Sequence, residues 1–289
     1  MRTPDRAVDE PAWPSMVSWL RERLGPRVDV DGLLAAGRFV HDDRTPVTAA
    51  EPYTPHTFLW FHRDLPDEVP VPGDLPVVHR DDRLVVVDKP AFLSTIPRGR
   101  HVVQSVVVRL RDELGPPELS PLHRLDRVTS GLLVLATARR WRAPYQRLFE
   151  TGAVGKTYRA LAPRDPGLVL PAVVRDHITK PRGGVRAEVV AGAGVNAETL
   201  VELEATRGDL AVYRLTPRTG RTHQLRLHLA GLGIPIVDDP LYPVDLQVPL
   251  DDHRRPLQLL AAELAFTDPV DGTARCFRSD RSLPLTAAP

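Results

Sequence analysis

The segment from His123 to Gly131 gathers side chains able to do chemistry within a chain of 289 residues. It reads HRLDRVTSG, and the apolar run LLVLA follows it at once. Polar residues at the mouth of a buried strand are held rigidly and are partly removed from water, which suits a carboxylate nucleophile such as Asp126. In the structural alternative, a neighbouring arginine pairs with Asp126 and the hydroxyl groups that follow cap a turn.

A second cluster, RTGRTHQLR, runs from Arg218 to Arg226. A turn that contains glycine, enters a helix and is flanked by three arginines is a natural site for an anion. It either holds a phosphate or supplies the cation that keeps a buried carboxylate ionised. The alternative is an amphipathic helix with a solvated arginine face. Tyr158, within an apolar stretch, is either a core residue or a surface on which a planar substrate stacks.

Absent motifs narrow the chemistry further. Cys276 is the only cysteine, which excludes disulfide frameworks and cysteine-based zinc sites. The sequence has no GxxxxGK(S/T) phosphate loop, no GxGxxG turn after a strand, no HExxH pair and no GxSxG elbow. We therefore expect a reaction without cofactor or metal, built on a carboxylate and arginines. Since the apolar runs are too short to cross a membrane and the N-terminus lacks a signal-peptide layout, we expect a cytoplasmic protein.

The pattern of apolar residues predicts the elements that hold these clusters. We expect strands at 83–87, 132–136 and 156–161, a hairpin of 199–204 with 210–216, and helices at 103–114, up to Gly152 and over 222–231. Several strands are joined as hairpins, which favours antiparallel pairing over a βαβ array. The sequence thus predicts an α+β fold with a mixed, mainly antiparallel central sheet and flanking helices.

Charge divides the chain into an acidic N-terminal part and a basic remainder. The whole chain has 38 Lys+Arg and 37 Asp+Glu, a net charge of +1. Residues 1–75 hold 8 basic and 13 acidic residues, whereas residues 76–289 hold 30 basic and 24 acidic residues. The stretch 62–76 is rich in Pro, Asp and Glu and reads as a linker. We expect a small module of two helices and a strand over 1–75, and a catalytic domain over 76–289 whose excess of positive charge suits a polyanion.

These motifs together resemble the RluA-type family of RNA pseudouridine synthases. The family's HRLD element is matched by HRLDRVTSGLLVLA, its lysine–tyrosine segment by KTYRA at 156–160, and its arginine–histidine element by RTGRTHQLRLH at 218–228. DKP at 88–90 matches a motif near the start of the family domain. The resemblance covers about residues 76–280 and implies the pseudouridine synthase catalytic fold. Residues 1–75 faintly resemble the small RNA-binding module that precedes many of these synthases, but their acidity opposes phosphate binding, so a degenerate module is expected.

The resemblance implies a role for three residues in catalysis. An enzyme of this family breaks the N1–C1′ glycosidic bond of a uridine, rotates the base and rejoins the ribose to C5. Asp126 is expected to be the catalytic carboxylate, by way of an adduct or a glycal. Tyr158 is expected to stack on the uracil and to assist removal of the C5 proton. Arg226 is expected to pair with Asp126 and to keep it ionised and oriented.

Five further residues are expected to contact the substrate. Arg124 is expected to enter the space that the uridine leaves when it flips out of its stack. The other four are His123, Thr129, Arg221 and His223. The chain departs from the family pattern at three positions: Leu260 stands where a histidine is common, Ile234 replaces a histidine and Asp238 replaces a glycine.

The function predicted from the sequence is an isomerase, an RNA pseudouridine synthase that acts on rRNA or tRNA. The alternative is a non-catalytic RNA-binding or RNA-folding factor on the same scaffold. A two-carboxylate glycosidase is a third hypothesis, which requires a second acid near Asp126. RNA is the expected partner, with no membrane and no obligatory protein partner, and a monomer is the default state.

Overall fold

The computed structural model describes residues 1–5, 13–26, 28–61, 67–97, 99 and 101–283. It divides the chain into two compact units, Met1–Asp67 and Glu68–Pro289. The buried clusters of apolar residues follow this division, since one lies within the first unit and four lie within the second. Among the helices of the described residues, none is long and apolar enough to cross a membrane.

The first unit contains two helices and a two-stranded sheet. Helix α1 covers Met16–Leu24, α2 covers Val30–Ala35, and strands β1 (Phe39–His41) and β2 (Leu59–Phe61) pair antiparallel. Ser15 caps the start of α1 with its hydroxyl, and Gly25 ends it with a φ of 75°, a backbone conformation that favours glycine. The predicted pattern of two helices and a strand is confirmed in this unit.

The boundary between the units lies earlier than the sequence predicts. The carboxylate of Glu68 accepts hydrogen bonds at 2.8 Å from the backbone N–H groups of Val102, Val103 and Gln104. Val71 is buried in the core of the second unit. The later part of the predicted linker therefore belongs to the second unit, whose first residue is Glu68. Residues 62–66 of that linker lie outside the described residues.

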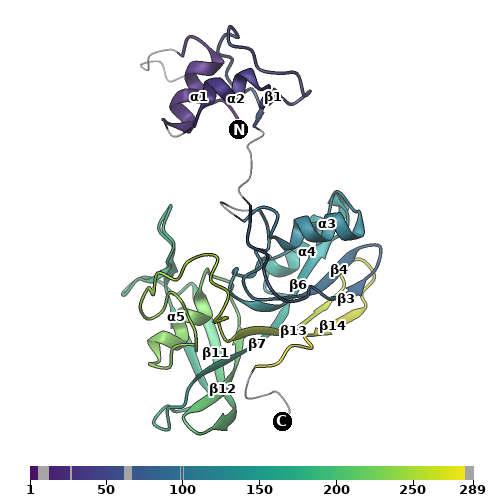
Figure 1. Cartoon of the computed structure of the whole chain (residues 1–289). Helices are drawn as coiled ribbons and strands as arrows, with labels where there is room; N and C mark the ends of the chain where they lie inside the picture. Colours follow the sequence, from purple (N-terminus) through teal and green to yellow (C-terminus); the bar gives the residue numbers. More distant parts are fainter. Residues whose placement is uncertain (6–12, 27, 62–66, 98, 100, 284–289) are drawn as a thin grey trace. The chain divides into compact units, whose positions relative to one another are not determined.

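A ten-stranded sheet forms the centre of the second unit (Figure 1). Its main path runs β3-β4-β6-β13-β7-β12-β11-β8, with β14 beside β13 and β5 beside β6. The strands are β3 Val77–Arg80, β4 Leu84–Lys89, β5 Ser120–Pro121, β6 Ser130–Ala136, β7 Gly155–Pro163, β8 Ala172–Asp176, β11 Ala197–Arg207, β12 Leu210–Pro217, β13 Leu259–Thr267 and β14 Ala274–Arg278. Every pair is antiparallel except β13 with β6. The predicted α+β class and mainly antiparallel sheet are confirmed.

Helices cover both faces of the β4–β6 half of this sheet. Alternate side chains of β4 point to opposite faces: Val85 and Val87 join a core with α3 (Val106–Leu114) and α5 (Gln224–Gly231), whereas Leu84 and Val86 join a core with α4 (Arg139–Glu150). Burial on both faces explains why LLVLA is apolar without alternation.

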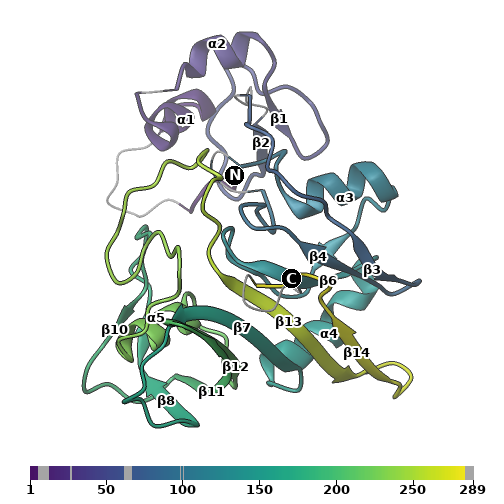
Figure 2. The same ribbon diagram turned by 60° about the horizontal axis from the view of Figure 1, so that its bottom comes forward.

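Three details of the second unit differ from the sequence prediction. Val103 lies before α3 and is exposed, because Ser105 occupies the N-cap position and the helix begins at Val106. Helix α4 begins at Arg139, before the apolar residues Tyr145, Leu148 and Phe149 that indicate a helix up to Gly152, and Trp141 extends the apolar face that they form. A small hairpin of β9 (Ile178–Thr179) and β10 (Glu188–Val189) follows β8 (Figure 2). We call residues 178–196 the arm.

Candidate active site

The loop that carries Asp126 is fixed by packing and by a turn. Leu125 and Val128 are buried in the core on the side of α3 and α5. The backbone N–H of Thr129 donates to the carbonyl oxygen of Asp126 at 3.1 Å, which closes a turn around the carboxylate. The Asp126 side chain is 34% exposed, so it is held by buried neighbours and remains open to a ligand.

Gly131 allows this loop to enter the sheet where β6 meets β13. Its φ is 109°, and a Cβ atom there would lie 2.3 Å from the carbonyl oxygen of Ala261. The parallel pairing of β6 with β13 therefore requires a residue without a side chain at this position. The final glycine of HRLDRVTSG thus allows β6 and β13 to pair closely at the point where the loop ends.

Arg226 lies between two carboxylates. Its Nε and Nη2 atoms donate to Asp239 at 2.8 and 2.5 Å, and its Nη1 lies 3.6 Å from Oδ2 of Asp126. Both Arg226 and Asp239 are almost fully buried. Burial by itself lowers the pKa of Arg226, but Asp239 and Asp126 raise it above its ordinary value. Asp239 therefore fixes one edge of the Arg226 guanidinium, and the other edge presents a permanent positive charge to Asp126.

Asp239, to which the sequence motifs assign no role, holds Arg226 in place. Its carboxylate also accepts from the backbone N–H groups of Leu241 (2.8 Å) and Tyr242 (3.0 Å). The preceding residue, Asp238, has a φ of 59°, a left-handed conformation that glycine and, less often, aspartate adopt. Asp238 therefore keeps the backbone shape of the glycine that the family pattern has there. The position of Asp239 within the family-like segment that ends at Tyr242 was the one sequence feature that could have indicated its importance.

His223 is the second basic side chain beside Asp126. Its Nε2 is 3.8 Å from Oδ2 of Asp126, and its Nδ1 is 2.8 Å from the hydroxyl of Tyr242. It adopts a left-handed φ of 57° directly before α5. Burial lowers the pKa of His223 to about 4; Asp126 opposes the shift, and the positive charges of Arg226 and Lys180 add to it. The imidazole is therefore neutral near pH 7, so it can form hydrogen bonds without bringing a positive charge to the site.

Tyr158, in β7, lies near enough to Asp126 for the two side chains to interact electrostatically. It pairs with Leu215 of β12 and Ala261 of β13, in the middle of the sheet, and packs partly on the core that holds Leu125. Burial raises the pKa of Tyr158, and the negative charge of Asp126 raises it further. The phenol is thus protonated at neutral pH. Within the described part of the chain its hydroxyl has no hydrogen-bond partner, which leaves it free for a ligand.

Lys89 connects the end of β4 to the loop that carries Asp126. It is fully buried, and its ammonium donates to the carbonyl oxygens of Leu93 (2.9 Å), Pro90 (3.0 Å) and Arg127 (3.2 Å). Burial lowers the pKa of Lys89 to about 7, although Asp126 opposes the shift. Since Arg127 follows Asp126 directly, Lys89 helps to fix the carboxylate. The DKP motif at 88–90 resembles the family pattern, but that resemblance assigns no role to Lys89.

Gln224 holds the RTGRTHQLR turn against the sheet. Its amide oxygen accepts from the Thr219 hydroxyl at 2.7 Å and from the Arg221 backbone N–H at 3.0 Å. Its amide nitrogen donates to the Glu198 carbonyl oxygen and the Thr199 hydroxyl of β11. These bonds place the start of α5, and hence Arg226, relative to β11.

The remaining predicted substrate contacts fall into two groups. Arg124 is exposed, and in the part of the chain that the structure describes its side chain has no hydrogen bond or ion pair. Arg221 is also exposed and donates from Nε to the Asn196 carbonyl oxygen. Thr129 and His123 lie against the protein itself: Thr129 is buried, and His123 accepts from the Val134 backbone N–H and stacks on Phe149. The structure therefore brings Asp126, Tyr158, Arg226 and His223 together, and it does not bring His123 to them.

Two departures from the family pattern fall in apolar surroundings. Leu260 is buried with Leu161 and Val212, and Ile234 is buried in the core beside α5. Both positions therefore hold an apolar residue that packs in an apolar core.

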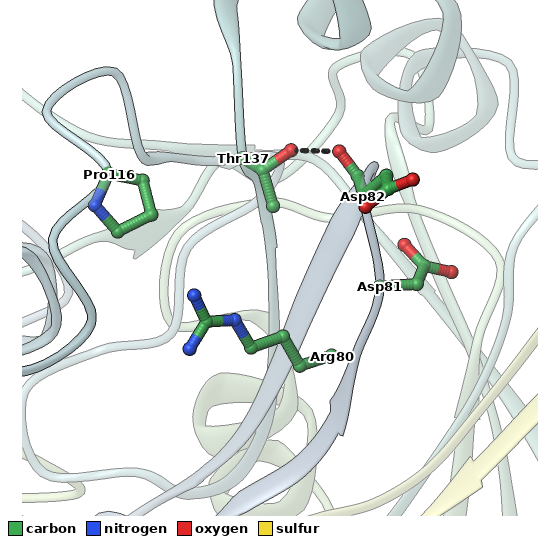
Figure 3. Close-up of a pocket in the computed structure, with 5 residues that line it drawn as sticks. All are labelled: Arg80, Asp81, Asp82, Pro116 and Thr137. Carbon is green, nitrogen blue, oxygen red and sulfur yellow. Dashed lines mark hydrogen bonds between the residues drawn. The ribbon is translucent and has the colours of Figure 1, made fainter.

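A hollow of about 430 Å³ lies elsewhere, at the far end of β4 and β6. It is lined by Arg80, Asp81, Asp82, Pro116 and Thr137, and the Thr137 hydroxyl donates to the Asp82 carbonyl oxygen within it (Figure 3). Thr137 follows β6, whereas Asp126 precedes it, so the length of the strand, roughly 20 Å, separates the two places. Open to water and away from Asp126, this hollow is not part of the candidate site. Among the described residues, no group of three or more His, Cys, Asp or Glu side chains could hold a metal ion.

The geometry supports chemistry at a single carboxylate. Asp239, the second acid close to Arg226, is fully engaged by Arg226 and two backbone N–H groups. A two-carboxylate glycosidase needs a second acid that is free to transfer a proton to the substrate or to activate water. The arrangement favours instead one carboxylate, oriented by a buried guanidinium and faced by a phenol.

Comparisons with known proteins agree with this picture. A family model described as RNA pseudouridylate synthase matches residues 83–231. The chain is 35% identical over 202 residues to the dual-specificity RNA pseudouridine synthase RluA of Pasteurella multocida, covering 68% of this chain and 88% of that protein. It is 32% identical over 212 residues to the protein of the same description from Escherichia coli strain K12, covering 71% and 92%. The solved structure of human RNA pseudouridylate synthase domain containing 4 matches with a TM-score of 0.55 and 28% identity, over 72% of this chain and 88% of that chain.

Proposed function

The chain belongs to the RNA pseudouridine synthase family, and on that premise we propose that it isomerises specific uridines of rRNA or tRNA at Asp126. Members of this family are isomerases that convert uridine to pseudouridine in RNA, so the chain is an RNA-modifying isomerase. The two bacterial relatives named above are described as dual-specificity enzymes, which leads us to seek targets in both rRNA and tRNA.

One observation carries the proposal: Asp126, Tyr158 and Arg226 come from three distant segments and meet around one carboxylate. Arg226 lies 3.6 Å from Asp126, and the charge of Asp126 raises the pKa of Tyr158 after burial has done so. These are the three residues to which the sequence motifs give catalytic roles. Their convergence supports a common function more strongly than any one motif.

The reaction we propose begins with a flipped uridine. Arg124, which is exposed and unpaired among the described side chains, fills the gap left in the base stack. Asp126 acts on the ribose, as the nucleophile of an adduct or as the base of a glycal route, and the N1–C1′ bond breaks. Arg226 stabilises the carboxylate throughout. The freed uracil turns on Tyr158 and C5 bonds to C1′; this bond displaces the Asp126 carboxylate in the adduct route, whereas in the glycal route C2′ regains the proton that Asp126 removed. C5 then loses its proton to water, assisted by Tyr158 packed against the ring, and N1 gains a proton from water, so that the product is an isomer of the substrate.

Chemical mapping of pseudouridine tests this function. Carbodiimide mapping of total RNA from a parent strain, a deletion strain and two complemented strains shows which uridines depend on the chain. We expect one or more pseudouridines to vanish on deletion, to return with the wild-type gene and to stay absent with Asp126→Asn. Identical maps in parent and deletion strains would count against the proposal and in favour of a non-catalytic RNA-binding factor.

The surroundings in which the enzyme works follow from the same proposal. We propose RNA as its partner, a monomer as its working state and the cytoplasm as its compartment. The net positive charge of residues 76–289 supports an RNA partner, because phosphate contacts depend on lysine and arginine.

A further inference from the structure

The arm, residues 178–196, is hydrogen-bonded to Tyr242, a residue that contacts His223 in the candidate active site. The hydroxyl of Tyr242 accepts from the backbone N–H of Ala187 and lies 2.8 Å from its carbonyl oxygen. Asn196 closes the base of the arm by bonding the backbone N–H and carbonyl groups of Ile178 at 2.8 and 3.1 Å. Leu227 of α5 packs against the buried side chains of the arm, and Figure 2 shows β10 beside α5. The arm therefore has a fixed base next to the helix that carries Arg226.

Tyr242 connects the arm to the catalytic pair. The guanidinium of Arg186, in the arm, lies 5.0 Å from the centre of the Tyr242 ring, and that of Arg226 lies 5.1 Å from it. Arg186 also donates to the carbonyl oxygen of Pro243 at 3.1 Å. Because the same hydroxyl group contacts His223, one tyrosine joins the arm, the catalytic arginine and the histidine beside Asp126.

Two cations on the arm have no protein partner. Lys180 and Arg182 are exposed, and over the ranges described neither side chain makes a hydrogen bond or an ion pair. The charge of Lys180 nevertheless reaches the site: together with burial, which has the largest effect, it lowers the pKa of His223. The arm contains three basic residues, the third being Arg186, and one acidic residue, Glu188, so its net charge is +2. Many other arginines on the surface of this unit, such as Arg175, Arg218 and Arg278, are paired with glutamates.

We propose that the arm is a phosphate-binding surface in which Lys180 and Arg182 hold the RNA backbone beside the flipped uridine. This rests on the proposed function and adds to it the segment that grips the strand at the site. Unpaired cations at a site open to a polyanion gain binding free energy by releasing counterions. The Arg186–Tyr242 contact then keeps the bound strand in register with Asp126.

Salt dependence of RNA binding tests the proposal. We would compare the full-length wild type, Lys180→Ala/Arg182→Ala, and a matched control, Arg164→Ala/Arg207→Ala, with fluorescein-labelled bulk bacterial tRNA as the probe. The control also removes two exposed, unpartnered cations, at the opposite end of β7 and β11. Each phosphate contact contributes about 0.7 to 0.9 to the slope of log affinity against log salt. We expect the arm variant to lose about 1.4 to 1.8 of this slope.

In concentration terms, a fourfold rise in salt should weaken the wild type about 7- to 12-fold more than the arm variant. A charge-preserving variant, Lys180→Arg/Arg182→Lys, should keep the wild-type slope. An unchanged slope in the arm variant, or an equal loss in the control, would overturn the proposal. The assay needs no turnover, so failure of the proposed isomerase activity would appear separately, in the pseudouridine map.

Discussion

Arg226 uses its two edges for different purposes. The Nε–Nη2 edge is bonded to Asp239, which is itself satisfied by two backbone N–H groups, and only Nη1 faces Asp126. A guanidinium held in this way cannot swing toward the substrate, whereas a lysine at the same position has no second edge to clamp. The orientation of the Asp126 carboxylate therefore depends on a residue, Asp239, that does not touch it.

Replacing Asp239 with asparagine tests this dependence. Asp239→Asn leaves Arg226 buried without its paired charge, and we expect a loss of about 3–5 kcal/mol in the free energy of unfolding. Pseudouridine formation should fall as well, because Arg226 loses its alignment. Asp238→Asn is the matched control: its partner Arg255 is 82% exposed, so a loss of at most about 1 kcal/mol is expected. Urea denaturation measures both, and equal losses would contradict the role assigned to Asp239.

Lys89 should leave a trace in the pH dependence of stability. Its folded pKa of about 7 lies below the ordinary lysine value of 10.5, so between these values the unfolded state binds more protons than the folded state. The contribution of this group to stability therefore rises with pH across that window, by at most about 1.4 kcal/mol per pH unit.

The measurement compares wild type with Lys89→Met, which has no titrating group at this position. The difference in unfolding free energy, wild type minus variant, should increase between pH 7 and pH 10, since the other titrating groups largely cancel. A difference that stays flat over this range would show that Lys89 keeps its ordinary pKa.

Residues were predictable where the motif itself carries the chemistry, whereas the roles of residues that act through a partner were not, even where a motif contains them. Asp126, Tyr158 and Arg226 stand in runs whose composition and resemblance point to chemistry. Asp239 and Lys89 act through contacts with Arg226 and with the Arg127 carbonyl, 13 and 38 residues away along the chain. A pairing across such separations is set by the fold, and a single sequence does not display it.

At the scale of elements, the crossing of β6 and β13 sets the position of the loop that carries Asp126. Gly131→Ala would place a Cβ atom 2.3 Å from the Ala261 carbonyl oxygen, and the residue also has a positive φ. We expect a loss of several kcal/mol in stability, with pseudouridine formation impaired. Gly208→Ala is the control, because Gly208 also has a positive φ (60°) but has no atom within 4 Å of the added Cβ. It should cost about 1 kcal/mol. Similar losses in thermal unfolding would contradict the role of the crossing.

Elements with a strong apolar pattern were predictable, and those defined by tertiary packing were not. The buried strands β4 and β6 are continuous apolar runs, and the hairpin of β11 with β12 alternates around Gly208. Helix α4 places Trp141, Tyr145 and Leu148 on one face, but Pro144 interrupts the helical pattern between them, so its start at Arg139 was not predicted. The arm contains two strands of two residues each and is held by Tyr242 and Asn196. Contacts of this kind come from elsewhere in the fold.

At the scale of the whole molecule, two separate cores and two opposite charges define two units. Residues 1–67 hold 8 basic and 11 acidic residues, so the first unit repels phosphate as a whole. The second unit holds the complete set of residues placed around Asp126. The near-neutral charge of the chain is therefore a cancellation between the units.

Truncation tests this division. We expect residues 68–289 to fold, to form pseudouridine and to bind RNA at least as tightly as the full chain, because the removed residues carry a net charge of −3. Residues 76–289 should be less stable, because that fragment lacks the Glu68 hydrogen bonds and the buried Val71. Thermal unfolding and titration with labelled tRNA measure these effects. A tenfold loss of affinity in the longer fragment would give the first unit an RNA-binding role.

The most direct test of the central claim is tritium release from RNA labelled at C5 of uridine. Wild-type protein should release tritium from labelled rRNA or tRNA isolated from a strain that lacks the gene. Asp126→Asn should release none, although it still binds the RNA. Asp82→Asn, an exposed carboxylate at the hollow roughly 20 Å away, should release tritium at the wild-type rate. Wild-type release by Asp126→Asn would contradict the assignment of Asp126 as the catalytic carboxylate.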